Sequence, residues 1–101
     1  MNSHISVRDG AIYLPADVVD TYFRGIDAVI VLLQECELRI MPVFQATSGG
    51  YLLKRRNAAG DRVVQARDVF LDKGLQDSSV RNLRVQWKAD KGALCADWPI
   101  I

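Results

Sequence analysis

The part of the chain richest in groups that could do chemistry is a basic segment at residues 54–67. Guanidinium and ammonium groups gathered around a hairpin contact phosphates and release their condensed counterions, so this segment predicts a polyanionic partner. Arg56 and Asn57 are the residues that could also reach base edges. The alternative is a solvated strand face, where charged residues commonly alternate and protect an edge. The segment carries one acid, Asp61, against five bases: Lys54, Arg55, Arg56, Arg62 and Arg67.

Charge is divided unevenly between the two halves of the chain, although the whole chain carries only +1. Residues 1–50 have three arginines against six acids, whereas residues 51–101 have ten Lys and Arg against six acids. A DNA-binding protein built from two similar modules should present bases from both of them. The acidic first half therefore favours a protein partner as the alternative to DNA.

The other polar residues give little support to an enzyme. His4 is the single histidine and lies close to the N-terminus, so it cannot supply a fixed Ser–His–acid relay or a multi-histidine metal site. Ser48-Gly49-Gly50 lacks the Gly-Lys-Ser/Thr ending of a phosphate-binding loop. Cys36 could be a reactive thiol or a plain free cysteine, since no base at a recognisable spacing activates it. We therefore expect no catalytic residue, no cofactor and no metal ion.

Length and composition predict one globular domain over residues 1–101, because half of the 101 residues are apolar and a quarter are charged. Cys36 and Cys95 form no paired-cysteine motif, which favours a reducing, cytoplasmic compartment. The longest apolar run, residues 28–33, is far shorter than a membrane span. The first four residues lack the basic and apolar regions of a signal peptide, so a secreted protein is not expected.

Two short helices are expected to punctuate a chain made mainly of strands. Pro15 suits the first position of a helix, which we expect to end at Arg24 with Gly25 as its stop signal. A second helix is predicted over residues 66–73, with Gly74 in the same role. Both glycines are followed by an aliphatic residue, which suits the hydrophobic contact of a Schellman-type helix end.

Alternating and apolar runs predict the strands, and turn residues separate them. Asp9-Gly10 marks a tight turn between two strands of a first hairpin. In the last hairpin Trp87 and Trp98 are expected to face each other, because their neighbours alternate in phase. Further strands are expected at residues 28–33, 38–41, 51–56, 62–65, 82–88 and 93–98, with a linker at residues 46–50.

The halves 1–46 and 51–101 show the same succession of strand, turn, strand, short helix and hairpin. Gly10 and Gly60 lie 50 positions apart, and the two helix-stop glycines lie 49 apart. Such spacing predicts an internal repeat. The alternative explanation is chance, because short strands and helices use the same few residue types. One ββαββ unit is too small to bury a core alone, so two units are expected to pack about a pseudo-twofold axis into one α+β, mostly β domain.

Residues 7–19 resemble the opening of the AbrB/MraZ swapped-hairpin family, in which a basic strand, a glycine, aliphatic residues and a proline precede a short helix. The resemblance continues through residues 25–31 and 38–42, and residues 54–75 look like a degenerate second copy. Two departures are Asp9 beside the glycine and Gln65 at the position of the family's proline. The resemblance implies a swapped-hairpin-like β-barrel made of two ββαββ pseudo-repeats.

The same resemblance implies a small bacterial DNA-binding transcriptional regulator. In that family, basic residues around the first strands and the helix start contact DNA, and the resemblance points to Arg8 in the first copy and to Lys54, Arg55, Arg56 and Arg62 in the second. The alternative is a non-enzymatic accessory or assembly protein that binds another protein through its β edges and its apolar C-terminus, residues 98–101; either could form a homo-oligomer. Together with the basic segment, the predicted nucleic-acid site comprises Arg8, Lys54, Arg55, Arg56, Asn57, Arg62 and Arg67.

Overall fold

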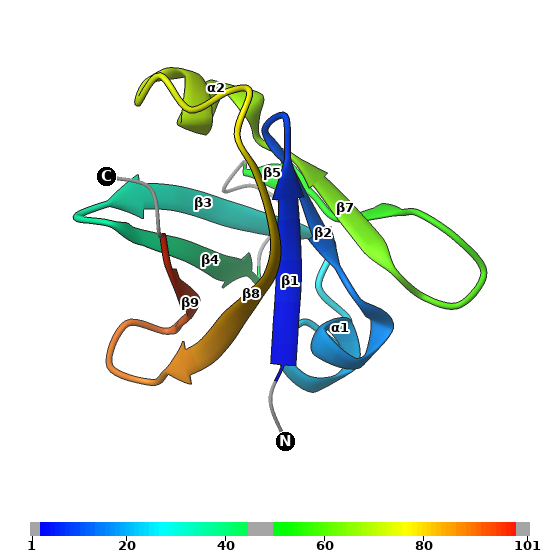
Figure 1. Ribbon diagram of the computed structural model, residues 1–101. Helices are drawn as coiled ribbons and strands as arrows, with labels where there is room; N and C mark the ends of the chain where they lie inside the picture. The colour runs from blue at the N-terminus through cyan, green and yellow to red at the C-terminus, as the bar shows by residue number, and fades with distance from the viewer. Residues whose placement is uncertain (1–2, 45–49, 99–101) are drawn as a thin grey trace.

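A computed structural model describes residues 3–44 and 50–98 of the protein. The described residues form a mostly β structure with two short helices, which confirms the predicted fold class (Figure 1). The helices are α1 (Ala16–Tyr22) and α2 (Arg67–Leu71). The strands are β1 (Ser3–Arg8), β2 (Ala11–Leu14), β3 (Ala28–Gln34), β4 (Glu37–Val43), β5 (Tyr51–Leu52), β6 (Lys54–Arg55), β7 (Arg62–Gln65), β8 (Ser79–Lys88) and β9 (Ala93–Asp97).

All nine described strands belong to one antiparallel sheet that curls into a nearly closed barrel, with α1 and α2 at opposite ends in Figure 1. The strand order is β5-β3-β4-β9-β8-β1-β2-β7-β6. The two outermost strands, β5 and β6, are separated along the chain only by Leu53. Residues 51–55 therefore pair with β3 at one end and with β7 at the other, which nearly closes the barrel.

Leu53 interrupts the strand that the sequence predicts over residues 51–56. Its side chain is buried in the core, while its N–H donates to the Asp27 carbonyl at 2.9 Å. Its own carbonyl accepts a hydrogen bond from the Arg62 guanidinium at 3.2 Å. The backbone groups of Leu53 thus leave the regular ladder but keep their partners, as a buried peptide must.

The strand pairing is unchanged when the two halves are exchanged. β2 pairs with β7, and β4 pairs with β9, so strands at the same place in each half lie side by side. The other cross-pairs are β1 with β8 and β5 with β3, in which the first strand of one half joins the third of the other. Tyr13 lies opposite Val63, its counterpart at the offset of 50, at the centre of this arrangement. A common origin of the halves stays a prediction.

In each half the turn of the first hairpin, β1–β2 or β6–β7, packs against the start of the helix in the other half. Gly10 has φ +81°, and its carbonyl accepts a hydrogen bond from the Ala66 N–H at 3.0 Å, just before α2. At the matching place the Ala16 N–H, at the start of α1, donates to Asp61 Oδ1 at 2.8 Å. No side chain of its own caps α1, so Asp61 caps this helix from the other half.

Both helices end earlier than predicted, and each ends three residues before its glycine. Gly25 and Gly74 have φ values of +74° and +70°, which confirms the left-handed conformation expected of them. At α2 the predicted Schellman end is present, since the Leu75 N–H donates to the Phe70 carbonyl at 2.8 Å and Gly74 to Leu71 at 3.0 Å. At α1 the prediction is wrong, because the Ile26 N–H bonds to the Phe23 carbonyl and closes only a tight turn.

The two tryptophans do not face each other as the sequence predicts. The Ala93–Asp97 strand is paired so that Trp87 lies opposite Leu94, and Trp98 comes four residues beyond that pair. Trp87 instead stacks on Tyr22, with ring centroids 5.9 Å apart, whereas buried Trp98 packs against Phe70 at 5.3 Å. The register set by the last hairpin separates the two rings, which the alternation of residues alone could not reveal.

The core fills the barrel with side chains from both halves. Aliphatic side chains at alternate positions along the strands point into the core. Phe70 of α2 and Phe23, the residue directly after α1, add one phenylalanine ring each. The largest fully buried side chains are Phe23, Phe70, Ile5, Ile12, Leu14, Leu38, Ile40 and Leu94. The predicted linker at residues 46–50 and the apolar terminus at residues 98–101 fall largely outside the described residues.

Candidate nucleic-acid interface

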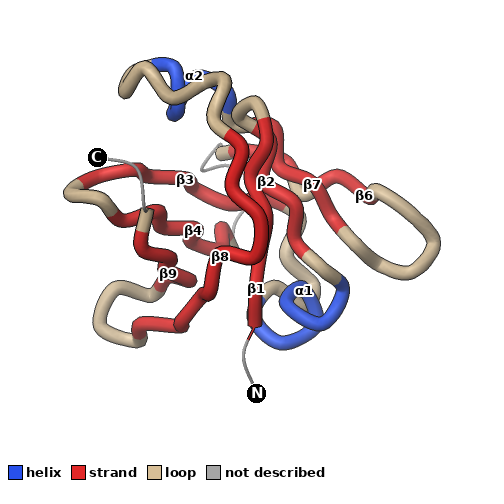
Figure 2. The backbone as a smooth tube through the Cα atoms, in the orientation of Figure 1, coloured by secondary structure: helices blue, strands red, loops and turns tan. Residues whose placement is uncertain are grey.

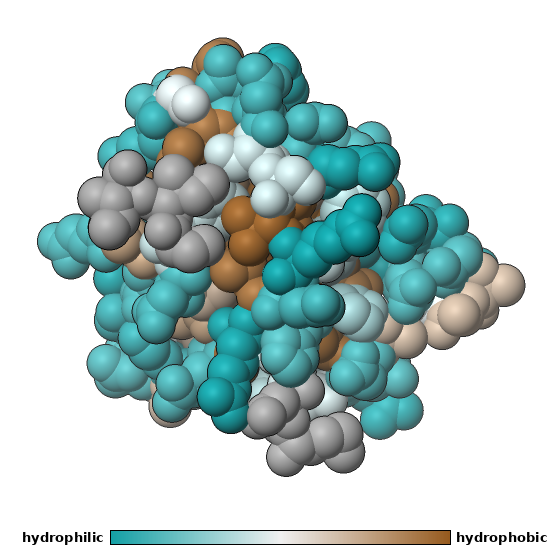
Figure 3. Space-filling view, in the orientation of Figure 1, coloured by the Kyte–Doolittle hydropathy of each residue, from teal (hydrophilic) through white to brown (hydrophobic). Residues whose placement is uncertain are grey.

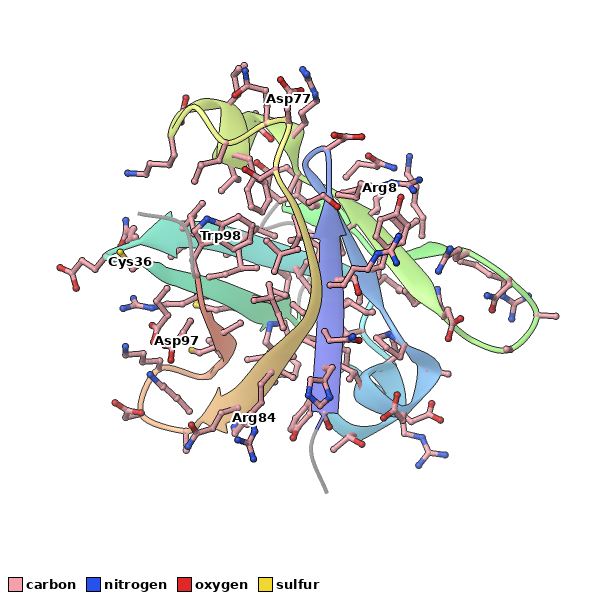
Figure 4. The ribbon with its side chains drawn as sticks, viewed as in Figure 1. Arg8, Cys36, Asp77, Arg84, Asp97 and Trp98 are labelled. Atoms are coloured by element: carbon pink, nitrogen blue, oxygen red, sulfur yellow. The ribbon has the colours of Figure 1, made fainter. Side chains whose placement is uncertain are left out.

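The seven predicted binding residues lie on β1, on the β6–β7 hairpin and at the start of α2, and they differ in what their side chains do. Lys54, Arg55 and Arg56 are exposed on the β6–β7 hairpin, which projects from the barrel in Figure 2. Arg8 is exposed at the end of β1, near the β1–β2 turn (Figure 4). Arg67 is exposed as well and lies 3.7 Å from Asp77 in a surface ion pair.

The side chains of Arg62 and Asn57 form hydrogen bonds within the protein that stabilise the hairpin. The half-buried Arg62 donates to the Leu53 carbonyl at the point where the barrel closes. The Asn57 amide donates to Asp61 Oδ2 at 2.9 Å, and its oxygen accepts from the backbone N–H groups of Ala59 and Asp61. These bonds occupy the Asn57 side chain within the turn, so reaching a base edge would require breaking them. Its role in base recognition stays a prediction.

Three arginines line one surface pocket of about 280 Å³. Arg8 comes from the first half of the chain, whereas Arg56 and Arg81 come from the second half. Tyr13 lines the pocket too, together with the hydroxyl-bearing residues Ser6 and Ser79. The pocket therefore gathers positive charge from both halves at a place where β1, β2 and β8 run side by side.

Arg81 is the binding candidate that sequence reasoning missed. β8 begins earlier than predicted, at Ser79, and carries an extra residue relative to β1 between its pairs Val7–Val80 and Ile5–Leu83. Asn82 in this bulge has φ +57°, a conformation that asparagine tolerates better than most residues. The sequence signal for this bulge was Asn82 itself, an asparagine at the start of the predicted strand over residues 82–88. A bulge changes the direction of the side chains beside it. Arg81 precedes Asn82 in this bulge and lines the pocket.

Neighbouring groups hold Arg56 at the pocket. Its guanidinium carbon lies 4.8 Å from the centroid of the Tyr13 ring, a cation–π contact. Asp61 is the one acidic residue among the described residues that line the pocket. Hydrogen bonds from the Asn57 side chain and the Ala16 N–H lower the pKa of Asp61, so it is a carboxylate at neutral pH, committed to the hairpin and to α1.

The pocket arginines are not held in close ion pairs within the described residues, although the Arg56 charge helps to lower the pKa of Asp61. Among the described residues, no ion pair within 4.0 Å involves Arg8, Arg56 or Arg81. Against three guanidinium charges the lining offers only Asp61, so the pocket keeps a positive balance. Hydrophilic side chains cover much of the face that carries β1 and β8 in Figure 3. Chemically, such an arrangement can bind an anion with several oxygens.

A second polar cluster, centred on Glu37, ties β4 to the β8–β9 hairpin. The Glu37 carboxylate lies 2.6 Å from Arg39, 2.6 Å from Lys88 and 3.0 Å from Lys91. These hydrogen-bonded cations, Lys88 foremost, lower the pKa of Glu37 from 4.5 to about 2. The side chain is only 12% exposed, so the cluster is a better-shielded ion-pair network than an isolated surface pair.

We expect Glu37→Gln to destabilise the protein at pH 7 by about 1–2 kcal/mol, after allowance for solvent screening. Because the folded-state pKa is depressed, this stabilisation is complete above about pH 4.5 and is lost as the pH falls towards about 2. Urea unfolding at pH 7 and pH 2 measures the difference, which should vanish at the lower pH. Glu35→Gln removes a neighbouring exposed carboxylate without a described ion pair and should have little effect. A pH-independent difference for Glu37→Gln would contradict the ion-pair explanation.

The cysteines and acidic residues form no further site in the described structure. Cys36 is exposed in the β3–β4 turn, whereas Cys95 is buried and burial raises the pKa of its thiol. Within residues 3–44 and 50–98, no group of three or more His, Cys, Asp or Glu side chains is placed to hold a metal ion. Neither α1 nor α2, the two helices of the described residues, is long and apolar enough to cross a membrane.

The comparisons with known proteins give no match: no family model, no curated protein and no solved structure is similar to this chain at a significant level.

Proposed function

We propose that the protein is a small DNA-binding regulator of the AbrB/MraZ type, acting in a reducing cytoplasm. The observation that carries the proposal is the pocket in which Arg8 of the first half meets Arg56 of the second half. The acidic first half is the main objection from the sequence, since a two-module DNA-binding protein should use both modules. Arg8 answers this objection, because it is a basic residue of the first half and lines the same pocket as Arg56.

Electrostatics supplies the binding in this proposal. Lys54 and Arg55 extend the positive surface from the pocket along the projecting hairpin, and both are exposed. Each phosphate that a Lys or Arg neutralises releases condensed counterions, so affinity should fall steeply as salt rises. Phosphate contacts position a protein on DNA without reading its sequence, and an arginine such as Arg56 would have to supply any base reading.

The double substitution Arg55→Ala/Arg56→Ala should weaken binding to mixed-sequence duplex DNA. If both residues contact phosphates, the slope of log K against log salt should fall in magnitude by about 2. A fluorescence-anisotropy titration at several salt concentrations measures it. Arg24→Ala/Lys73→Ala removes the same charge from exposed positions outside the pocket and serves as the control. Equal losses in both double variants, or no binding by the wild type at low salt, would contradict the proposal.

A second candidate function, an accessory protein that binds another protein, is favoured by a different surface. The outward positions of β3 and β5 carry Ile30 and Leu52, which are 37% and 61% exposed. Phe44, directly after β4, is 82% exposed. Exposed apolar residues on adjoining strands favour a protein contact. The free β edges in the described sheet belong to the two-residue strands β5 and β6, so the predicted docking through edges has little backbone to use. Absence of DNA binding in the titration above would favour this candidate.

A further inference from the structure

We propose that the pocket between Arg8, Arg56 and Arg81 is a specific site for one phosphate monoester group. This goes beyond docking to duplex DNA, because the site would bind its ligand without a double helix. The shared chemistry is a terminal phosphate, which either a free mononucleotide or the 5′ end of a nucleic-acid strand can supply.

The charge of the pocket favours a phosphate monoester. A phosphate monoester carries close to two negative charges at neutral pH. The pocket offers three guanidinium groups against the single carboxylate of Asp61, which already accepts hydrogen bonds from Asn57 and Ala16. A net charge near +2 matches a dianion better than a monoanionic carboxylate or a backbone diester. Guanidinium groups also present paired N–H donors that fit the oxygens of phosphate.

The fold holds the backbone that carries two of these donors, Arg8 and Arg81. Arg8 is the last residue of β1, and it pairs with Ala11 on one side and Ser79 on the other. Arg81 lies in the β8 bulge, one residue after Val80, which pairs with Val7. Arg8 and Arg81 therefore start from strands whose relative positions are fixed by ladders, so little backbone order must be created when a ligand binds.

Arg56 is held in a different way. Its N–H donates to the Asp61 carbonyl at 2.9 Å, and its guanidinium lies against the Tyr13 ring. This contact leaves the guanidinium edge, with its N–H donors, as the group that meets an anion. The Tyr13 side chain thus acts as a positioning residue for Arg56.

The size of the pocket also suits a phosphate ester. A volume of about 280 Å³ exceeds what a bare phosphate ion needs and lies just below the usual range for small-molecule sites. The apolar parts of Leu14 and Pro15 also line the pocket, and they could contact the organic group that carries the phosphate. Ser6 and Ser79 add hydroxyl groups to the lining, which can donate to further phosphate oxygens.

Titration of the isotopically labelled full chain by NMR spectroscopy tests this inference. The probes are inorganic phosphate, adenosine monophosphate and one short single strand with either a 5′-phosphate or a 5′-hydroxyl, all at constant ionic strength set with sodium chloride. We expect saturable shifts at the amides of Arg8, Ser79 and Arg81. Tighter binding of the mononucleotide than of the phosphorylated strand identifies a free nucleotide as the source, and the reverse order identifies a strand end. Similar affinities for all phosphorylated probes mean that the phosphate group alone is recognised.

Arg81→Ala should weaken phosphate binding by about tenfold or more, the usual loss for one charge-assisted hydrogen bond. Arg24→Ala is the matched control, since Arg24 is also an exposed arginine but does not line the pocket. Arg8→Ala provides a second test at another strand, and thermal melting checks that each variant folds. Unsaturable shifts spread over the basic surface, or equal phosphate affinity in wild type and Arg81→Ala, would overturn the proposal. Because these arms contain no duplex, their failure is distinguishable from a failure of DNA binding.

Discussion

Gly10→Ala should destabilise the protein by about 3–5 kcal/mol, an effect large enough to threaten folding of a domain of this size. Gly10 has φ +81°, a conformation that costs any residue with a side chain about 1–3 kcal/mol. A Cβ atom there would also lie 2.5 Å from the Cα of Arg67, which is backbone and cannot simply rotate away. The first hairpin would have to move away from the start of α2, in the other half. Thermal unfolding should show a midpoint lower by roughly 15–25 °C.

Gly25→Ala separates the two causes. Gly25 has nearly the same backbone conformation, φ +74°, but nothing lies within 4 Å of where its Cβ atom would be. This variant should therefore lose only the conformational part, about 1–2 kcal/mol. If the two variants were equally destabilised, the close approach between the Asp9-Gly10 turn and Arg67 would not contribute, and the contact between the halves would be weaker than the structure indicates.

Local signals in the sequence predicted most of the elements, because their causes are local. Pro15 immediately precedes α1 as its extended N-cap and not as its first helical residue, Gly74 takes the left-handed conformation three residues after α2 ends, and Asp9-Gly10 turns the chain. The interruption at Leu53 and the separation of Trp87 from Trp98 were not predictable in this way. Both depend on how one strand is placed against another, which a pattern within a single strand does not encode.

The candidate site was predictable only in part. Arg8 and Arg56 were predicted from the family resemblance, and the basic segment pointed independently to the β6–β7 hairpin. That these two residues line one pocket follows from the pairing of β1, β2, β7 and β6, which brings the two first hairpins together. Arg81 depends in addition on a bulge in β8, a long-range feature that one asparagine signals only weakly.

Phe70→Ala should destabilise the protein by about 3–5 kcal/mol, the usual loss when a fully buried aromatic ring is removed. Phe70 is 0% exposed, and its ring centroid lies 5.3 Å from that of Trp98. The helix that carries it, α2, has only five residues, far too few to be stable by itself. Its position is therefore maintained by this ring, and the cavity left by alanine should also loosen α2. Urea unfolding gives the loss of stability, and tryptophan fluorescence reports on the surroundings of Trp98.

Leu71→Ala is the matched control, because Leu71 is the next residue of the same helix and is 52% exposed. It removes an apolar side chain of similar length, but at the surface, where substitutions usually change stability by less than about 0.5 kcal/mol. Phe70→Leu should fall between the two variants, since leucine fills part of the space. Comparable losses in Phe70→Ala and Leu71→Ala would mean that burial of the Phe70 ring does not hold α2 in place, because alanine is the strongest helix former and cannot weaken the helix through propensity. In that case α2 would give the Gly10 turn no firm surface to pack against, and Gly10→Ala should then cost no more than Gly25→Ala.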